Sequence, residues 1–343
     1  MKKTTVLILI ALASLLTGVF PLAAQGNETF TSQLGLTTFD YPTGWVVDES
    51  DMPGMIMIGS SQAALDEYGN RAEIPDGEIV VTMLEPQAIS ALAFSFEAGM
   101  SLDEAFDVLK TVSAGQLSDS EAHVFGGYPA LVASDDAGIG MAVLLDLDGD
   151  LMIAIAQAGK GGLQNQQQAW FALLNTLQYA KPDGMIPYTV AGNGMGLEFP
   201  AGWQMLDFAG MIRLTNQIDM AAYDEPLLPG SVKISILVPT LAKLYTMPLG
   251  EMLSPEKIFP QYASSYINEE NFTLGTVESL TVAGYAAEQA TFTSDLCDGY
   301  VILVHFDDEN AALVSIAAAS GESAQAREAA APILDSLIYT PEE

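Results

Sequence analysis

An internal repeat is the feature that most constrains how this chain can fold. The residues FDYPTGWVVDES at 39–50 recur in degenerate form as LEFPAGWQMLDF at 197–208. Two further pairs keep nearly the same spacing: GYPA at 127–130 with GYAA at 284–287, and LLNTLQY at 173–179 with ILDSLIY at 333–339. The three offsets are 158, 157 and 160 residues. Matches that stay in register at three separate places indicate a tandem duplication, and repeats of this length are whole domains.

Hydrophobic alternation and turn residues predict the elements of the first repeat. We expect strands in LTTFDY at 36–41, WVV, MIMIG at 55–59 and EIVVTML at 78–84, with a short helix from Gln62 to Tyr68. Ser101-Leu102-Asp103-Glu104 is a capping box, which predicts a helix that continues to about Ala114. Four short strands should follow in AHVF, YPALVASD, IGMAVLLDL and DLMIAIA. A helix from about Gln164 to Gln178 completes the repeat.

The second repeat predicts the same order of elements. Its strands are expected in MGLEF, VKISILV at 232–238, TLGTVES, YAAEQATF, GYVILVHF and AALVSIAAA. Ser254-Pro255 should begin the central helix, and the final helix should end at Ile338. Pro332 stands where the first repeat has Ala172, so the final helix is expected to kink or restart there.

Short strands separated by Gly and Asp turns favour antiparallel pairing. The predicted fold class is therefore α+β, with two tandem domains that each contain an antiparallel sheet and helices. About 319 residues after an N-terminal leader are enough for two hydrophobic cores. We place the first domain at 26–181, a Pro- and Gly-containing linker at 182–187, and the second domain at 188–340.

The N-terminus is typical of a secretory signal peptide. Lys2 and Lys3 precede the uncharged apolar run from Val6 to Leu16, and Ala24 offers a small residue for cleavage. Residues 1–24 are thus predicted to be removed, which places the protein in the periplasm or outside the cell. The run is shorter than the ~20 residues that span a bilayer, so insertion in the membrane after cleavage is not expected.

Strong acidity limits the classes of partner. Without Lys2 and Lys3 the chain has 9 basic residues against 44 acidic ones, so its formal net charge is 9 − 44 = −35. Nucleic acid and anionic membrane surfaces would be repelled, whereas cations and basic proteins or peptides would be attracted. Half of the residues are hydrophobic and 16% are charged, so the composition is that of a folded protein.

The motif FDYPTGW at 39–45, its degenerate copy LEFPAGW at 197–203 and the order of elements around them resemble the PsbP-like family. This family includes the extrinsic P subunit of photosystem II, Mog-type factors that bind the GTPase Ran, and exported bacterial proteins of unknown role. The resemblance implies an α/β/α sandwich, with helices packed on the faces of each antiparallel sheet. It also implies that Trp45 and Trp203 lie just past a turn, with their rings in a core.

Residues that carry catalysis or bind metals are sparse. His123 and His305 lie on different predicted strands at non-equivalent positions, so they are interpreted as structural. Cys297 has no possible intrachain disulfide partner and is interpreted as a small, partly buried residue. The Gly-rich residues 192–196 lead into a strand, which argues against a phosphate-binding loop and for a linker. The patterns GxSxG, HExxH and CxxC do not occur.

The acidic run from Asp146 to Asp150 begins like a calcium loop, but Leu151 and Gln157 stand where an EF-hand needs Gly and Glu. It is better explained as an Asp-Gly hairpin turn, and 307–310 occupies the corresponding turn of the second repeat. The sequence therefore assigns no catalytic, cofactor-binding or metal-ligating residue and no cofactor. The favoured function is a non-catalytic binding or accessory protein with a protein or small-molecule partner outside the cytoplasm. A weak calcium-binding protein and a hydrolase with an unrecognised carboxylate pair are the two alternatives.

Overall fold

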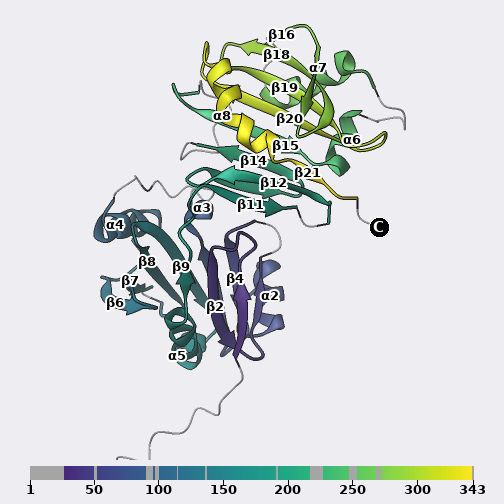
Figure 1. Cartoon of the computed structure of the whole chain (residues 1–343). Helices are drawn as coiled ribbons and strands as arrows, with labels where there is room; N and C mark the ends of the chain where they lie inside the picture. Colours follow the sequence, from purple (N-terminus) through teal and green to yellow (C-terminus); the bar gives the residue numbers. More distant parts are fainter. Residues whose placement is uncertain are drawn as a thin grey trace, which may run out of the picture.

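The computed structural model describes residues 27–49, 52–89, 96, 100–113, 115–135, 137–190, 192–216, 227–246, 253–267 and 272–341. The predicted signal peptide lies outside this part of the chain. The described elements form two units, which we call the first unit (residues 27–181) and the second unit (residues 185–341). Figure 1 shows the two units one above the other, with helices against the sheets of each.

The first unit contains two antiparallel sheets. The small sheet has the order β1-β2-β10, with β1 at Asn27–Thr31, β2 at Thr37–Pro42 and β10 at Gln178–Tyr179. The large sheet has the order β3-β4-β5-β9-β8-β7-β6. Its strands are β3 Val46–Asp48, β4 Met55–Gly59, β5 Ile79–Leu84, β6 Glu121–Phe125, β7 Tyr128–Ser134, β8 Gly140–Leu147 and β9 Asp150–Ala158. The helices are α2 Gln62–Gly69, α3 Pro86–Ile89, α4 Leu102–Val112 and α5 Gly162–Asn175.

The second unit repeats this topology. Its small sheet has the order β11-β12-β21, with β11 at Met185–Thr189, β12 at Met195–Pro200 and β21 at Ile338–Tyr339. Its large sheet has the order β13-β14-β15-β20-β19-β18-β16, and β17 pairs with β18. These strands are β13 Gln204–Phe208, β14 Met211–Thr215, β15 Val232–Leu237, β16 Phe272–Leu274, β17 Glu278–Val282, β18 Tyr285–Ser294, β19 Asp298–His305 and β20 Ala311–Ala318. The helices are α6 Pro239–Thr246, α7 Pro255–Ile267 and α8 Ser323–Asp335.

Helices cover both faces of each large sheet. In the first unit, the α5 side chains Trp170, Leu173 and Leu174 pack with the small sheet on one face. The α4 residues Phe106 and Leu109 pack on the other face. In the second unit, α8 lies with the small sheet on one face, while α6 and α7 share a core on the other. Side chains alternate across a strand, so two apolar faces require two covering layers. The predicted α+β class, with antiparallel sheets flanked by helices, is confirmed.

Individual hydrogen bonds also recur in both units. The Tyr128 hydroxyl accepts the Tyr179 N–H (3.1 Å), and the Tyr285 hydroxyl accepts the Tyr339 N–H (3.3 Å). In the same way, Thr176 Oγ1 accepts the N–H of Asp40, and Ser336 Oγ accepts the N–H of Glu198. These bonds join the C-terminal end of the first unit to β7 and β2, and that of the second unit to β18 and β12. The two ends of each unit are therefore held together.

The repeated Pro-x-Gly-Trp motif forms the same turn twice. The Trp45 N–H donates to the Pro42 carbonyl and the Trp203 N–H to the Pro200 carbonyl, both at 3.0 Å. The glycine between them has φ of 96° at Gly44 and 86° at Gly202, a conformation that side chains disfavour. Both tryptophans lie just past the turn, as the family resemblance implies, but their rings are only partly buried and pack against the core of their unit from outside it.

Three boundaries differ from the sequence prediction. Residues 185–187, which the sequence assigns to the linker, form the first part of β11, because their backbone pairs with β12. Helix α5 ends at Asn175, and the residues after it form the short strand β10. Helix α8 continues through Pro332 to Asp335 without restarting. Pro332 lies near the end of this helix, where Ile333 and Leu334 are buried, so core packing outweighs the one backbone bond that proline cannot make.

Candidate functional site

A groove of about 910 Å³ opens on the first unit, where the C-terminal end of α4 faces the loops that join the central strands. Its floor is formed by residues of β8 and β9, among them Ala142 and Ile155. One wall is the end of α4 and the segment after it. The opposite wall is formed by the chain after α2 and the chain after β9.

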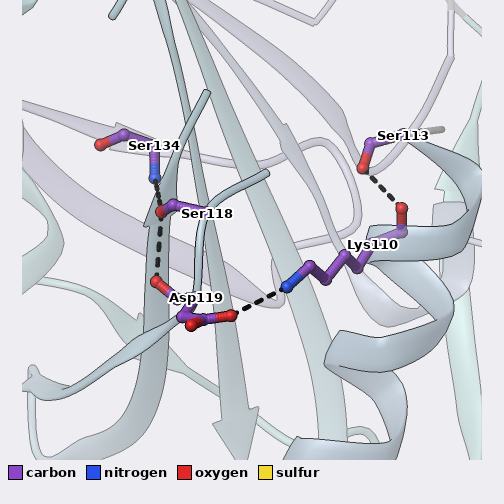
Figure 2. Close-up of polar contacts among 5 residues, drawn as sticks. All are labelled: Lys110, Ser113, Ser118, Asp119 and Ser134. Carbon is purple, nitrogen blue, oxygen red and sulfur yellow. Dashed lines mark hydrogen bonds and ion pairs between the residues drawn. The ribbon is translucent and has the colours of Figure 1, made fainter. Parts of the chain in front are cut away.

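The α4 wall is held by a chain of polar contacts, which Figure 2 shows. Lys110 Nζ lies 3.0 Å from Asp119 Oδ1, and Ser113 Oγ donates to the Lys110 carbonyl at the end of the helix. The Ser118 N–H donates to the Ser134 carbonyl, and Ser118 Oγ accepts the Ser134 N–H. The capping box at the other end of α4 is present as predicted, with Ser101 and Glu104 bonded in both directions. The helix that borders the groove is therefore fixed at both ends.

Two glycines allow the opposite wall to close tightly. A Cβ atom on Gly159 would lie 2.1 Å from the Pro75 carbonyl oxygen, and one on Gly162 would lie 2.1 Å from the Glu78 carbonyl oxygen. Neither distance is tolerated by a real side chain. The Gly159 N–H donates to the Glu78 carbonyl, and the Gly77 N–H donates to the Lys160 carbonyl. These bonds hold the two segments of this wall together.

The chemistry of the groove is an apolar floor below a mainly acidic rim. Leu109, Leu117, Met141, Ala142 and Ile155 supply the apolar surface. The charged lining residues are Glu73, Asp76, Asp135 and Lys160. Asp135 has a structural task as well, because its Oδ1 accepts the N–H of Ile139, a residue whose side chain is 50% exposed at the groove. Such a surface can bind a ligand that combines apolar groups with positive charge.

The second unit has a smaller hollow on its corresponding face. It has a volume of about 500 Å³ and lies between α7 and the segment that leads into β17. Phe259, Leu274, Val277 and Ala290 line it, with Glu256 as its charged residue. The two repeats therefore share their architecture but differ in the surfaces that they offer.

A second polar feature lies buried beside the junction of the two units. Glu49, at the end of β3, is 6% exposed, and Glu85, between β5 and α3, is 0% exposed. Glu49 Oε1 accepts the Gly54 N–H (2.8 Å) and Oε2 accepts the Gln33 N–H (2.7 Å). Neither oxygen of the Glu85 carboxyl has a hydrogen-bond partner within 3.5 Å among the residues that the structure describes.

Burial dominates the protonation of both groups. It raises the pKa of Glu49 from 4.5 to about 7, although the two N–H donors act to lower it, and the nearby Glu85 adds a small increase. Burial also raises the pKa of Glu85, against the opposing effect of the neighbouring Thr37 and Ser32. Neither carboxyl lines the groove.

The junction itself is apolar around these acids. Leu34 and Leu36, from the turn before β2, belong to the same buried cluster as Ile186 and Tyr188 of the second unit. Helix α3 contacts β13, and Figure 1 shows α3 where the two units meet. The Tyr188 hydroxyl donates to Asp207 Oδ2 at 2.7 Å. Burial raises the Tyr188 pKa most, and the carboxylates of Asp207 and Glu49 raise it further.

The residues singled out in the sequence are dispersed over the molecule. His123 stacks on Phe125 at the edge of the first unit, and His305 Nε2 lies 2.6 Å from Glu288 Oε2 in the second. Cys297 lies in the turn before β19, where it is more deeply buried than the sequence interpretation had it, and its Sγ is 3.7 Å from Ser294 Oγ. Asp148 and Gly149 have φ of 58° and 93°, which fits the predicted two-residue hairpin turn. The turn at 307–310 is longer and is closed by the Asp307 carboxylate.

Sequence reasoning missed both the groove and the buried pair. The groove depends on three loops that lie far apart in the sequence. Glu85 does carry a local signal: it follows the continuous apolar run IVVTML and precedes Pro86, where a charged residue is unexpected next to a buried strand. Within the described residues, no three acidic, His or Cys side chains are arranged to hold a metal ion. Nor does that part of the chain contain a helix suited by length and apolarity to cross a membrane.

Comparisons with known proteins assign no family. No family model and no curated protein matches the sequence. Three solved structures illustrate the similarities that were found. Cyanobacterial PsbP (CyanoP) from Synechocystis is 14% identical over 47% of this chain and 96% of its own, with a TM-score of 0.29. A protein from Bacteroides thetaiotaomicron is 16% identical over 49% of this chain and 55% of its own, with a TM-score of 0.28. The type VI secretion immunity protein TplEi from Pseudomonas aeruginosa is 11% identical over 94% of this chain and 99% of its own, with a TM-score of 0.24. Identities and scores this low carry no argument about function, and the PsbP-like resemblance stays a prediction.

Proposed function

We propose that this protein is an exported binding or accessory protein, and that the groove of the first unit binds a basic, amphipathic peptide segment. The observation that carries the proposal is the combination of an apolar floor with the carboxylates of Glu73, Asp76 and Asp135 on the rim. A groove of about 910 Å³ has room for several side chains of such a peptide.

Charge supports the same class of partner. The whole chain carries a formal charge of −33, so a cationic peptide is attracted before it reaches the groove. Apolar contact with the floor would then slow its dissociation. The N-terminal sequence, which is typical of a signal peptide, supports an encounter outside the cytoplasm.

The test is binding of a fluorescein-labelled peptide of alternating Lys and Leu residues, followed by fluorescence anisotropy. The double variant Glu73→Gln/Asp76→Asn removes two exposed rim charges. We expect it to weaken binding about fivefold to thirtyfold, equivalent to roughly 1–2 kcal/mol for two rim charges.

The matched control is Asp308→Asn/Glu309→Gln, which removes the same charge from an exposed turn of the second unit. It should change the affinity by less than about twofold, because distant exposed charges are screened by salt. Equal weakening by the two double variants would show that the peptide senses only net charge, and the groove would not be the binding site. A peptide of alternating Glu and Leu that binds equally well would also contradict the proposal.

A further inference from the structure

The buried Glu49–Glu85 pair has a natural comparison within the same chain. Glu49 corresponds to Asp207 through the Pro-x-Gly-Trp repeat, and both carboxylates accept the N–H of a glycine, Gly54 or Gly210. The carbonyl of that glycine accepts the backbone N–H of Glu85 in the first unit (2.7 Å) and of Val238 in the second (3.0 Å). A proline follows each of these residues and begins α3 or α6.

Valine therefore occupies the Glu85 position in a turn of the same construction. The backbone bond to the glycine forms with either residue, so the turn does not require a carboxylate at that position. A carboxyl with no exposed surface is far more costly to bury when it is ionised than when it is protonated. Glu85 therefore destabilises the packed arrangement unless the pair holds a proton.

The position of the pair connects this cost to the junction. Glu85 immediately precedes α3, which contacts β13 of the second unit. Glu49 is bonded to the Gln33 N–H, one residue before Leu34, which is buried among residues of the second unit. Separation of the two units would uncover Leu34 and α3, which adjoin Gln33 and Glu85 in the chain, and would so give water a route to the two carboxyls.

We propose that the Glu49–Glu85 pair makes the packing of the two units against each other depend on protonation, with the packed arrangement favoured while the pair holds a proton. This proposal uses residues outside the groove and does not depend on the proposed ligand.

The direction follows from the shifts of the two acids. In the packed state burial raises the Glu49 pKa from 4.5 to about 7 and also raises the Glu85 pKa. At a pH between about 4.5 and 7, the packed state therefore binds more protons than the separated state. Packing is therefore strongest at low pH and weakens as the pH rises from about 4.5 to 7. Each proton released changes the equilibrium by at most about tenfold per pH unit.

Other titratable groups face the pair from the surrounding elements. They are Tyr179 on β10, whose hydroxyl donates to Asp150 on β9, and Tyr188 on β11, whose hydroxyl donates to Asp207. Lys181 Nζ lies 3.3 Å from Asp150 Oδ1. Burial raises the pKa of both tyrosines, so they stay neutral from pH 4.5 to 8. The neighbouring Gln33, Ser32, Thr37 and Gln87 do not titrate.

The test is hydrogen exchange of the whole two-unit chain between pH 5 and 8, corrected for the intrinsic exchange rate. The backbone N–H groups of 87–89, 185–186 and 188–189 report on the junction, and those of β8 report on the interior of the first unit. We expect the junction of the natural chain to open more with rising pH, by up to about a hundredfold between pH 5 and 7, while β8 stays protected.

Glu85→Val should make this change smaller, and Glu49→Gln/Glu85→Val should abolish it. His305→Gln, in the second unit away from the junction, should leave it intact. An unchanged pH response in the double variant, or no pH response in the natural chain, would overturn the proposal. If the double variant does not fold, the carboxyl carbon of Glu49 is titrated by NMR in the natural chain. A midpoint near 7 supports the proposal, and a midpoint near 4.5 overturns it.

Discussion

Gly159 and Gly162 illustrate how single residues shape the groove. Neither has an unusual backbone conformation, so their value lies in the space that a hydrogen atom leaves next to a carbonyl. Glu85 and Val238 illustrate the opposite situation, in which one backbone geometry accepts either a carboxyl or an apolar group. The close approach of the backbone fixes glycine at the first two positions, whereas the turn before α3 and α6 accepts more than one side chain.

Substitution of Gly162 by alanine should lower the free energy of unfolding by about 1–3 kcal/mol, because the Glu78 carbonyl must move. Urea denaturation measures the difference. Gly69→Ala is the matched control: that glycine ends α2, where a Cβ atom would meet no neighbouring atom within 4 Å, so alanine should be neutral or slightly stabilising. Equal effects of the two substitutions would contradict the explanation by close approach.

At the scale of elements, α4 is stabilised both by its local sequence and by its packing against the sheet. Its capping box satisfies backbone donors at the first turn, Lys110 lies in its last turn, and Phe106 and Leu109 attach it to the sheet. Because its C-terminal end forms a wall of the groove, the stability of this helix bears directly on the proposed binding site.

Ser101→Ala should destabilise the protein by about 1 kcal/mol, since the N–H of Glu104 loses its acceptor. Thr111→Ala, on the exposed side of the same helix, should change stability by less than about 0.5 kcal/mol. Thermal unfolding followed by circular dichroism distinguishes them. A cost at Ser101 no greater than that at Thr111 would mean that the capping box contributes nothing.

Elements with strong local signals were predictable, and those that depend on distant partners were not. The capping box, the Asp148-Gly149 hairpin and the apolar run of β5 each indicate their structure within a few residues. The two-residue strands β10 and β21 exist only because β2 and β12 offer an edge for pairing. The kink predicted at Pro332 was wrong because the burial of α8 outweighs the backbone hydrogen bond that proline cannot make. The groove could not be predicted because it combines loops that no local pattern connects.

At the scale of the whole molecule, the two units are alike in topology and unlike in surface. The first unit offers the larger groove, and the second supplies much of the apolar cluster that covers Leu34 and Leu36. The domain limits 26–181 and 188–340 stay a prediction. Because β11 begins at Met185, the start of the second domain is better placed before that residue. A second piece should begin before Met185 so that β11 is retained.

Pieces covering 26–181 and 184–343 should each unfold cooperatively, because each contains its own cores. Both should melt below the temperature of the intact chain, since separation exposes Leu34 and Leu36 on one side and Ile186 and Tyr188 on the other. Calorimetry of the pieces and of the whole chain tests this. Two pieces that lack any cooperative transition would show that the units share one folding unit.

The burial of Leu34 and Leu36 by the second unit also has a consequence for biosynthesis. A chain is made from its N-terminus, so these two leucines are present long before residues 185–341 exist to cover them. During that interval the two leucines lack the second-unit side chains that bury them, and a chaperone that binds this exposed hydrophobic surface would protect the chain from aggregation. The chaperone would dissociate once β11 and β12 have formed and covered the two leucines. The order of synthesis would therefore determine when the chain no longer needs the chaperone.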